Sequence, residues 1–138
     1  MKSLLNPYVN FNGKAREAVE FYHGIFGGEL QITSYKDGGM SQDPSTDNLV
    51  MHAMFESENG MTVMCSDVPP GMPYNPGNNV SISLSGDNEV ELRGYWDKLI
   101  VEGTVGMPLE KAPWGDTFGM LVDKFGIGWM VNISGVTK

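Results

Sequence analysis

The feature that most constrains the fold of this chain is an internal repeat about half its length. Each copy has an extended run, a polar turn, an amphipathic segment and a glycine, first in PYVNFNG with KAREAVEFYHGIFGGEL and then in NVSISLSG with DNEVELRGYWDKLIVEGTV. Phe21-Tyr22 corresponds to Tyr95-Trp96, an offset of 74 residues. Solenoid repeats are usually shorter, about 20–50 residues, so the sequence predicts a duplicated half-domain.

Each copy contains one predicted helix. The apolar stripe of the first helix consists of Ala15, Ala18, Val19, Tyr22, Ile25 and Phe26, and that of the second consists of Leu92, Tyr95, Trp96, Leu99 and Ile100. Both stripes follow the helical spacing that places apolar side chains on one face. The expected end residues are Asn12 or Gly13 and Gly27-Gly28 for the first helix, and Asp87 or Asn88 and Gly103 for the second.

The remaining apolar runs alternate as strands do. The predicted strands are residues 6–11, 29–35, 49–56, 61–66, 79–85, 104–110, 117–122 and 129–134. Residues 36–48 form a polar, mobile loop, and four prolines in residues 67–78 predict a semi-rigid linker. We therefore expect one α+β domain over residues 1–138, with βαβββ modules at about 1–66 and 79–138. If the two mixed sheets curl together, their free faces enclose a cavity, the usual place for a ligand.

Composition excludes several kinds of partner. The chain has 17 acidic and 9 basic residues, a net charge of −8, which disfavours nucleic acid and anionic membrane surfaces. No apolar run approaches the roughly 20 residues of a spanning helix, and the start of the chain lacks a secretory signal. The single cysteine, Cys65, cannot form an intrachain disulfide, which fits a cytoplasmic protein.

Short motifs in order along nearly the whole chain give a family resemblance. They are Pro7-Tyr8, Phe11-Asn12-Gly13, Glu17-Ala18, Glu20-Phe21-Tyr22, Gly27-Gly28-Glu29, His52-Ala53, Met64, Ser66-Asp67, Met107-Pro108-Leu109, Trp114-Gly115, Phe118-Gly119, Asp123, Phe125-Gly126 and Trp129-Met130. With the duplicated strand–helix–three-strand pattern, they resemble the vicinal oxygen chelate superfamily, which includes glyoxalase I, extradiol dioxygenases and the fosfomycin and bleomycin resistance proteins. The closer resemblance is to its PhnB-like branch.

The superfamily's usual divalent metal is held by His and Glu side chains at four strand positions. The resemblance places those positions near Pro7, Met64, Ser81 and Met130 in this chain. First-row metals prefer imidazole, thiolate or carboxylate ligands, so we expect neither a metal nor another cofactor. Some relatives are named as a ubiquinone-pathway methyltransferase, but the sequence has no glycine-rich strand–loop–helix unit for a methyl donor.

The resemblance and strand alternation together point to candidate ligand-binding residues. The candidates are Tyr8, His52, Met64, Ser66, Ser81, Trp114, Phe118, Met130 and Asn132. Serine and asparagine would supply polar contacts, and Trp114 and Phe118 an aromatic wall. The alternative for each is ordinary packing or a cross-strand hydrogen bond.

Other reactive side chains have simpler interpretations. We expect His23 on the solvated helix surface, Cys65 buried against the helix, Glu56 and Glu58 in solvent, and Asp67 capping the turn that follows it. Met is abundant, at 10 residues, and fills gaps between strands.

Two functions remain open. The first is a homodimeric, metal-free protein that binds a small molecule. The second is an enzyme, either with His52 as a general base or with a metal at positions the resemblance does not identify. A structural or partner-binding module is a third possibility.

Overall fold

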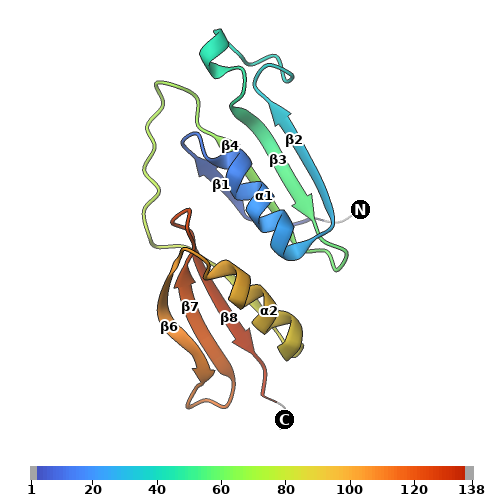
Figure 1. Cartoon of the computed structure of the whole chain (residues 1–138), viewed down its shortest axis with the longest axis vertical. Coiled ribbons are helices and arrows are strands. Elements are labelled where there is room, and N and C mark those ends of the chain that lie inside the picture. Colours follow the sequence, from blue (N-terminus) through green and yellow to red (C-terminus); the bar gives the residue numbers. More distant parts are fainter. Residues whose placement is uncertain (1–2, 136–138) are drawn as a thin grey trace. The chain divides into compact units, whose positions relative to one another are not determined.

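The computed structural model describes residues 3–135. The chain divides into two compact units, Met1–Pro76 (unit 1) and Gly77–Lys138 (unit 2). Each unit is one four-stranded mixed sheet with one helix packed on it (Figure 1). No helix within the described residues is long and apolar enough to cross a membrane. The cavity expected between the two sheets stays a prediction.

Unit 1 begins with a parallel strand pair and continues as an antiparallel sheet. Its elements are β1 (Tyr8–Phe11), α1 (Ala15–Phe26), β2 (Glu29–Ser34), the 3₁₀ turn η1 (Pro44–Thr46), β3 (Val50–Glu56) and β4 (Thr62–Asp67). The strand order is β1-β4-β3-β2, with β1 parallel to β4 and the other neighbours antiparallel. The predicted loop at residues 36–48 is therefore partly ordered by η1.

Unit 2 repeats this topology. Its elements are β5 (Ser81–Gly86), α2 (Glu89–Leu99), β6 (Thr104–Lys111), β7 (Thr117–Val122) and β8 (Gly128–Ile133). The strand order β5-β8-β7-β6, with only β5 and β8 parallel, matches that of unit 1. The predicted α+β fold and internal repeat are confirmed, and the eight predicted strands agree within two residues at each end.

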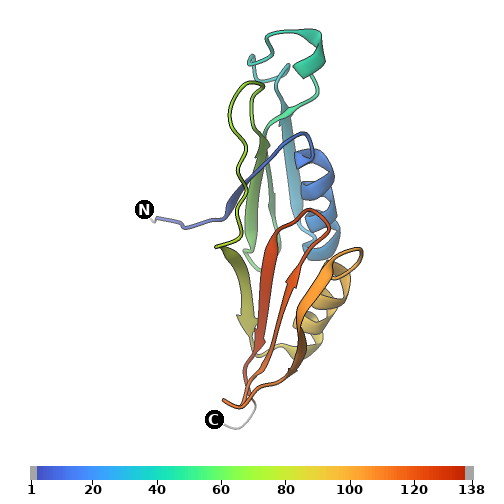
Figure 2. The ribbon, with the colours of Figure 1, turned by 90° about the vertical axis from the view of Figure 1, so that its left-hand side faces the viewer.

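Each helix covers one face of its own sheet, as Figure 2 shows with the sheets seen nearly edge-on. The predicted stripe of α1 is buried, and Phe26 stacks on Phe55 of β3 with ring centroids 5.6 Å apart. In unit 2, Trp96 of α2 lies so close to β7 that a Cβ at Gly119 would be 2.8 Å from its ring. These contacts identify which residues of each strand face the helix, and alternation places the others on the uncovered face.

One glycine in each unit allows the chain to turn from the helix into the next strand. Gly28 has a φ of +89°, and a Cβ there would lie 1.9 Å from the Glu56 carbonyl oxygen. Gly103 occupies the corresponding place in unit 2, where a Cβ would lie 2.5 Å from the Val122 carbonyl oxygen. A side chain at either position would collide with backbone, so the close approach requires glycine.

The start of α1 is capped from a distant strand, which the sequence analysis did not anticipate. Lys14 is at the N-cap without a side-chain cap, so neither Asn12 nor Gly13 has the expected role. Instead the buried Asp67 carboxylate accepts hydrogen bonds from the Gly13 and Ala15 amides at 2.9 and 3.0 Å. The prediction that Asp67 caps the turn after it is wrong.

Asp67 also fixes the start of a neighbouring strand. Its second carboxylate oxygen accepts from the Val50 amide at 2.9 Å, so one buried group satisfies three backbone donors. In unit 2 the helix is capped locally, as expected, with Asn88 accepting from the Glu91 amide at 3.1 Å. The two units therefore reach the same topology with different capping residues.

We predict that Asp67→Asn strongly destabilises unit 1. The amide retains one acceptor oxygen and places donors against the backbone amides, so hydrogen bonds to a charged group, each contributing about 1.5–3 kcal/mol, are lost. The expected decrease in the free energy of unfolding is about 2–4 kcal/mol, measured by urea denaturation. Asp37→Asn, at an exposed position in the same unit, is the matched control and should change it by less than about 0.5 kcal/mol.

Candidate functional site

The face of the unit 1 sheet opposite α1 carries four of the nine predicted ligand-binding residues. Tyr8 comes from β1, Met64 and Ser66 from β4, and His52 from β3. Tyr8 is opposite Met64 across the β1–β4 pair, and Met64 is opposite Met54 across the β4–β3 pair. The structure therefore brings the four residues together on one partly exposed surface, here called the unit 1 face.

Tyr8 and His52 interact directly. The Tyr8 hydroxyl oxygen lies 3.3 Å from Nδ1 of His52, and the two ring centroids are 5.7 Å apart. Because β4 lies between β1 and β3, the Tyr8 side chain must extend across β4 to make this contact. The pair combines a phenol and an imidazole, two side chains of the kinds that serve as general acids and bases in enzymes.

The corresponding face of unit 2 carries another four predicted residues. Ser81 lies on β5, Phe118 on β7, and Met130 and Asn132 on β8. Asn132 is opposite Phe118, and Met130 is opposite both Ser83 and Met120. These residues define the unit 2 face, which is richer in apolar side chains than the unit 1 face.

The ninth predicted residue, Trp114, lies in the turn between β6 and β7. It is 62% exposed and packs edge-on against Phe118, with ring centroids 5.7 Å apart. Trp96 and Trp129 are 6% and 1% exposed and belong to the core. Trp114 is therefore the only tryptophan of the described residues whose ring is largely open to solvent.

Two of the predicted polar contacts are already satisfied within the protein. Asn132 donates from Nδ2 to Asp116 at 3.0 Å, and Asp116 also accepts from the Gly135 amide at 2.9 Å. Ser66 donates to Oδ1 of Asn10 at 3.0 Å. The sequence analysis missed Asn10, although its position two residues after Tyr8 in a strand places both side chains on the same face.

The four positions at which the resemblance places metal ligands do not fit a first-row divalent metal. The Pro7 carbonyl is used by the Met64 amide at 3.0 Å. Met64 and Met130 offer thioethers and Ser81 a neutral hydroxyl, and none of these replaces imidazole or carboxylate. Within residues 3–135, no three His, Cys, Asp or Glu side chains gather in a way that could hold a metal ion.

The surroundings of three further sets of side chains were also predicted from the sequence. Cys65 is fully buried, as expected. Glu56 and Glu58 are exposed, as expected. His23 is half-buried rather than solvated, and its Nε2 donates to the Gly28 carbonyl at 2.9 Å, which helps to fix the turn after α1.

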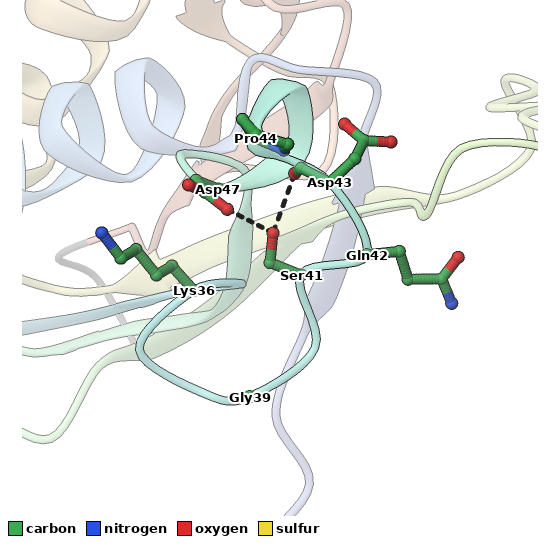
Figure 3. Close-up of a pocket in the computed structure, with 7 residues that line it drawn as sticks. All are labelled: Lys36, Gly39, Ser41, Gln42, Asp43, Pro44 and Asp47. Carbon is green, nitrogen blue, oxygen red and sulfur yellow. Dashed lines mark hydrogen bonds between the residues drawn. The ribbon is translucent and has the colours of Figure 1, made fainter.

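A separate polar pocket of about 350 Å³ lies in the loop between β2 and β3 (Figure 3). It is lined by Lys36, Gly39, Ser41, Gln42, Asp43, Pro44 and Asp47. Ser41 donates to the Asp43 carbonyl at 3.0 Å and to the Asp47 carboxylate. Hydrogen bonds from Ser45 lower the pKa of Asp43. None of the nine predicted residues lines this pocket, and its internal hydrogen bonds account for the order of the loop.

Comparisons with known proteins agree with the fold. A family model described as 3-demethylubiquinone-9 3-methyltransferase matches residues 3–132. The crystal structure of PA1353 from Pseudomonas aeruginosa is 36% identical, covers 97% of this chain and 99% of its own, and has a TM-score of 0.82.

Two further solved structures extend the similarity. A PhnB protein from Bacillus cereus is 29% identical over 96% of this chain and 100% of its own, with a TM-score of 0.73. A glyoxylase/bleomycin resistance protein/dioxygenase domain from Frankia sp. EAN1pec is 11% identical over 97% of this chain and 98% of its own, with a TM-score of 0.66. The Frankia domain supports the fold alone.

We predict that Cys65 makes the protein less stable in alkaline solution. Burial, with a smaller effect from Asp67, raises the pKa of the thiol from its ordinary value of 9.0 to about 12. Between these pH values the unfolded chain loses the proton and the folded chain keeps it. The folded state therefore binds more protons, and the free energy of unfolding falls as pH rises, by up to about 1.4 kcal/mol per pH unit.

Urea denaturation at several pH values measures this alkaline decrease in the free energy of unfolding. Cys65→Ala should remove most of the alkaline decrease, and the remainder is expected from Tyr35, whose pKa is also raised by burial. A native thiol that reacts at once with a thiol reagent at pH 8 contradicts the prediction.

Proposed function

Because this chain belongs to the family described as 3-demethylubiquinone-9 3-methyltransferase, the PhnB-like branch of the vicinal oxygen chelate superfamily, we propose that it binds a small organic molecule without a divalent metal. The observation that carries the proposal is the position of the nine candidate residues. Eight lie on the uncovered sheet faces, and Trp114 lies beside Phe118 at the edge of one of them. These faces combine thioethers, aromatic rings and a few hydrogen-bonding groups, the usual lining of a ligand site.

Methyl transfer is less well supported by the residues present. A methyl donor of the usual kind binds at a glycine-rich strand–loop–helix unit. In β1–α1, the amides of Gly13 and Ala15 are used by Asp67. In β5–α2, the Asn88 side chain already accepts from the Glu91 amide at the helix start. Neither helix start therefore fits such a donor.

The Tyr8–His52 contact supports a second candidate function, acid–base catalysis on the bound molecule. An imidazole next to a phenol on a partly exposed face can act as a general base or acid toward a bound molecule. Turnover that survives chelation and is abolished by His52→Gln distinguishes this enzyme from a binding protein.

The proposal includes the assembly and location of the protein. A homodimer is expected from the family resemblance, and a cytoplasmic location fits the single free cysteine. Gel filtration of the protein at high concentration tests the dimer, and a monomer there contradicts it.

We predict that ligand binding perturbs Trp114. Of the three tryptophans, Trp114 has the exposed ring. A planar ligand stacked beside Phe118 should therefore quench or shift its fluorescence, while the buried Trp96 and Trp129 respond little. A panel of planar aromatic drugs and phosphonates is screened by thermal shift, and hits are titrated by fluorescence. For a ligand stacked there, Trp114→Ala should weaken binding by about tenfold or more.

Val90→Ala is the matched control, because Val90 is exposed on α2, away from the unit 2 face. It should leave the affinity unchanged. Elemental analysis of untagged protein tests the metal-free part of the proposal. A stoichiometric metal held by protein side chains contradicts that part, and the absence of any hit from the panel contradicts ligand binding.

A further inference from the structure

Four polar side chains of the unit 1 face form two hydrogen-bonded pairs, Asn10 with Ser66 and Tyr8 with His52. Asn10 on β1 is opposite Ser66 on β4, and His52 on β3 lies one position before Ala53, which is opposite Cys65. Asn10, Ser66 and His52 therefore follow one another across three adjacent strands. Tyr8 extends across β4 to join His52.

The two hydrogen bonds occupy acceptor atoms of Asn10 and His52 and leave hydrogen-bond donors of both side chains available. Ser66 donates to Asn10 Oδ1, so both hydrogens of Asn10 Nδ2 remain for another partner. If the Tyr8 hydroxyl donates to Nδ1 of His52, the neutral imidazole must carry its hydrogen on Nε2. Within residues 3–135, neither Asn10 Nδ2 nor His52 Nε2 has a hydrogen-bond partner.

We propose that Asn10 and His52 form a donor pair that selects aromatic carboxylates, because both carboxylate oxygens are hydrogen-bond acceptors. This inference rests on the proposed binding function and names the ligand class of the unit 1 face. Asn10 Nδ2 and His52 Nε2 donate to the two oxygens, and Tyr8 and Ser66 are positioning residues that hold the donors in this state.

The rest of the face orients such a ligand. Met54 and Met64 lie in the next row of the sheet and offer a polarisable apolar surface for a flat ring. Glu29 and Glu56 are opposite each other at the far end of the same sheet and are exposed. Because these carboxylates repel an anion, the acceptor oxygens are directed to the Asn10–His52 end and the apolar body lies over the methionines.

The first test needs no ligand. Nitrogen-15 NMR at about pH 8.5, where imidazoles are generally neutral, reports which ring nitrogen of His52 carries hydrogen. The proposal requires the Nε2–H tautomer in the native protein, and Tyr8→Phe should convert it to a mixture. A dominant Nδ1–H tautomer overturns the proposal, because Nε2 is then an acceptor.

The second test compares two probes that share one ring. Benzoate offers two acceptor oxygens, whereas benzylammonium offers only donors and is favoured non-specifically by the net charge of −8. We expect benzoate, and not benzylammonium, to shift the NMR signals of the Asn10 side-chain amide and the His52 ring. Stronger binding of the cation at these residues overturns the proposal.

Asn10→Asp is the decisive variant, since it keeps the acceptor for Ser66 and replaces the donor with an acceptor. It should weaken benzoate binding by about tenfold or more. Gln31→Glu, an equal charge change on β2 of the same sheet, is the matched control and should weaken binding much less. Equal losses in the two variants overturn the donor-pair assignment.

The outcomes separate this inference from the proposed function. Benzoate shifts confined to the Trp114–Phe118 region overturn the donor pair and leave small-molecule binding in place. No binding of benzoate or of any compound in the drug and phosphonate panel overturns both.

Discussion

The buried carboxylate of Asp67 is the interaction on which the geometry of unit 1 depends. It accepts backbone hydrogen bonds from the β1–α1 turn and from the first residue of β3, while belonging itself to the end of β4. Tyr35, the first residue after β2, donates a hydrogen bond to the Asp67 carbonyl at 2.7 Å. One residue therefore joins all four strands of the sheet, at the end near His52 and Asn10.

This connection matters because the Tyr8–His52 contact joins strands that are not neighbours. A small change in the position of β1 relative to β3 would separate a hydroxyl and a ring nitrogen that are 3.3 Å apart. The carboxylate holds the end of β1 and the start of β3 at a common point, so it limits that change. Stability and the arrangement of the polar face thus have the same physical origin, the buried Asp67 carboxylate.

The sequence predicted what depends on local pattern. Helical periodicity identified α1 and α2, and strand alternation placed Met64 and Ser66 on one face and Cys65 on the other. Either Asp87 or Asn88 was expected to cap the second helix, and Asn88 does so. Family resemblance added the topology. Each of these rests on spacings of a few residues or on a motif that can be seen in one chain.

What the sequence did not predict depends on long-range register. Asp67 caps a helix that begins 52 residues earlier, and no local spacing connects the two. The Tyr8–His52 contact needs the order β1-β4-β3 and a side chain that crosses the middle strand. Asn10 could have been recognised by alternation from Tyr8, but its hydrogen bond with Ser66 follows only from the parallel pairing of β1 and β4.

The duplication explains how the two faces came to differ while the fold did not. The topology depends on glycines that admit close backbone contacts, Gly28 and Gly103, and on helix caps, which can be supplied by different residues. The side chains of the uncovered faces neither admit these close contacts nor cap the helices, so they can differ between the units without changing the fold. Because Pro7, Met64, Ser81 and Met130 offer no imidazole or carboxylate, the selectivity of the proposed site would depend on hydrogen-bond direction and apolar surface. In the proposed binding function, thioethers and rings would contribute most of the favourable contact. A few fixed donors would decide which ligands retain it, because an unmatched polar group costs more free energy than a matched one returns.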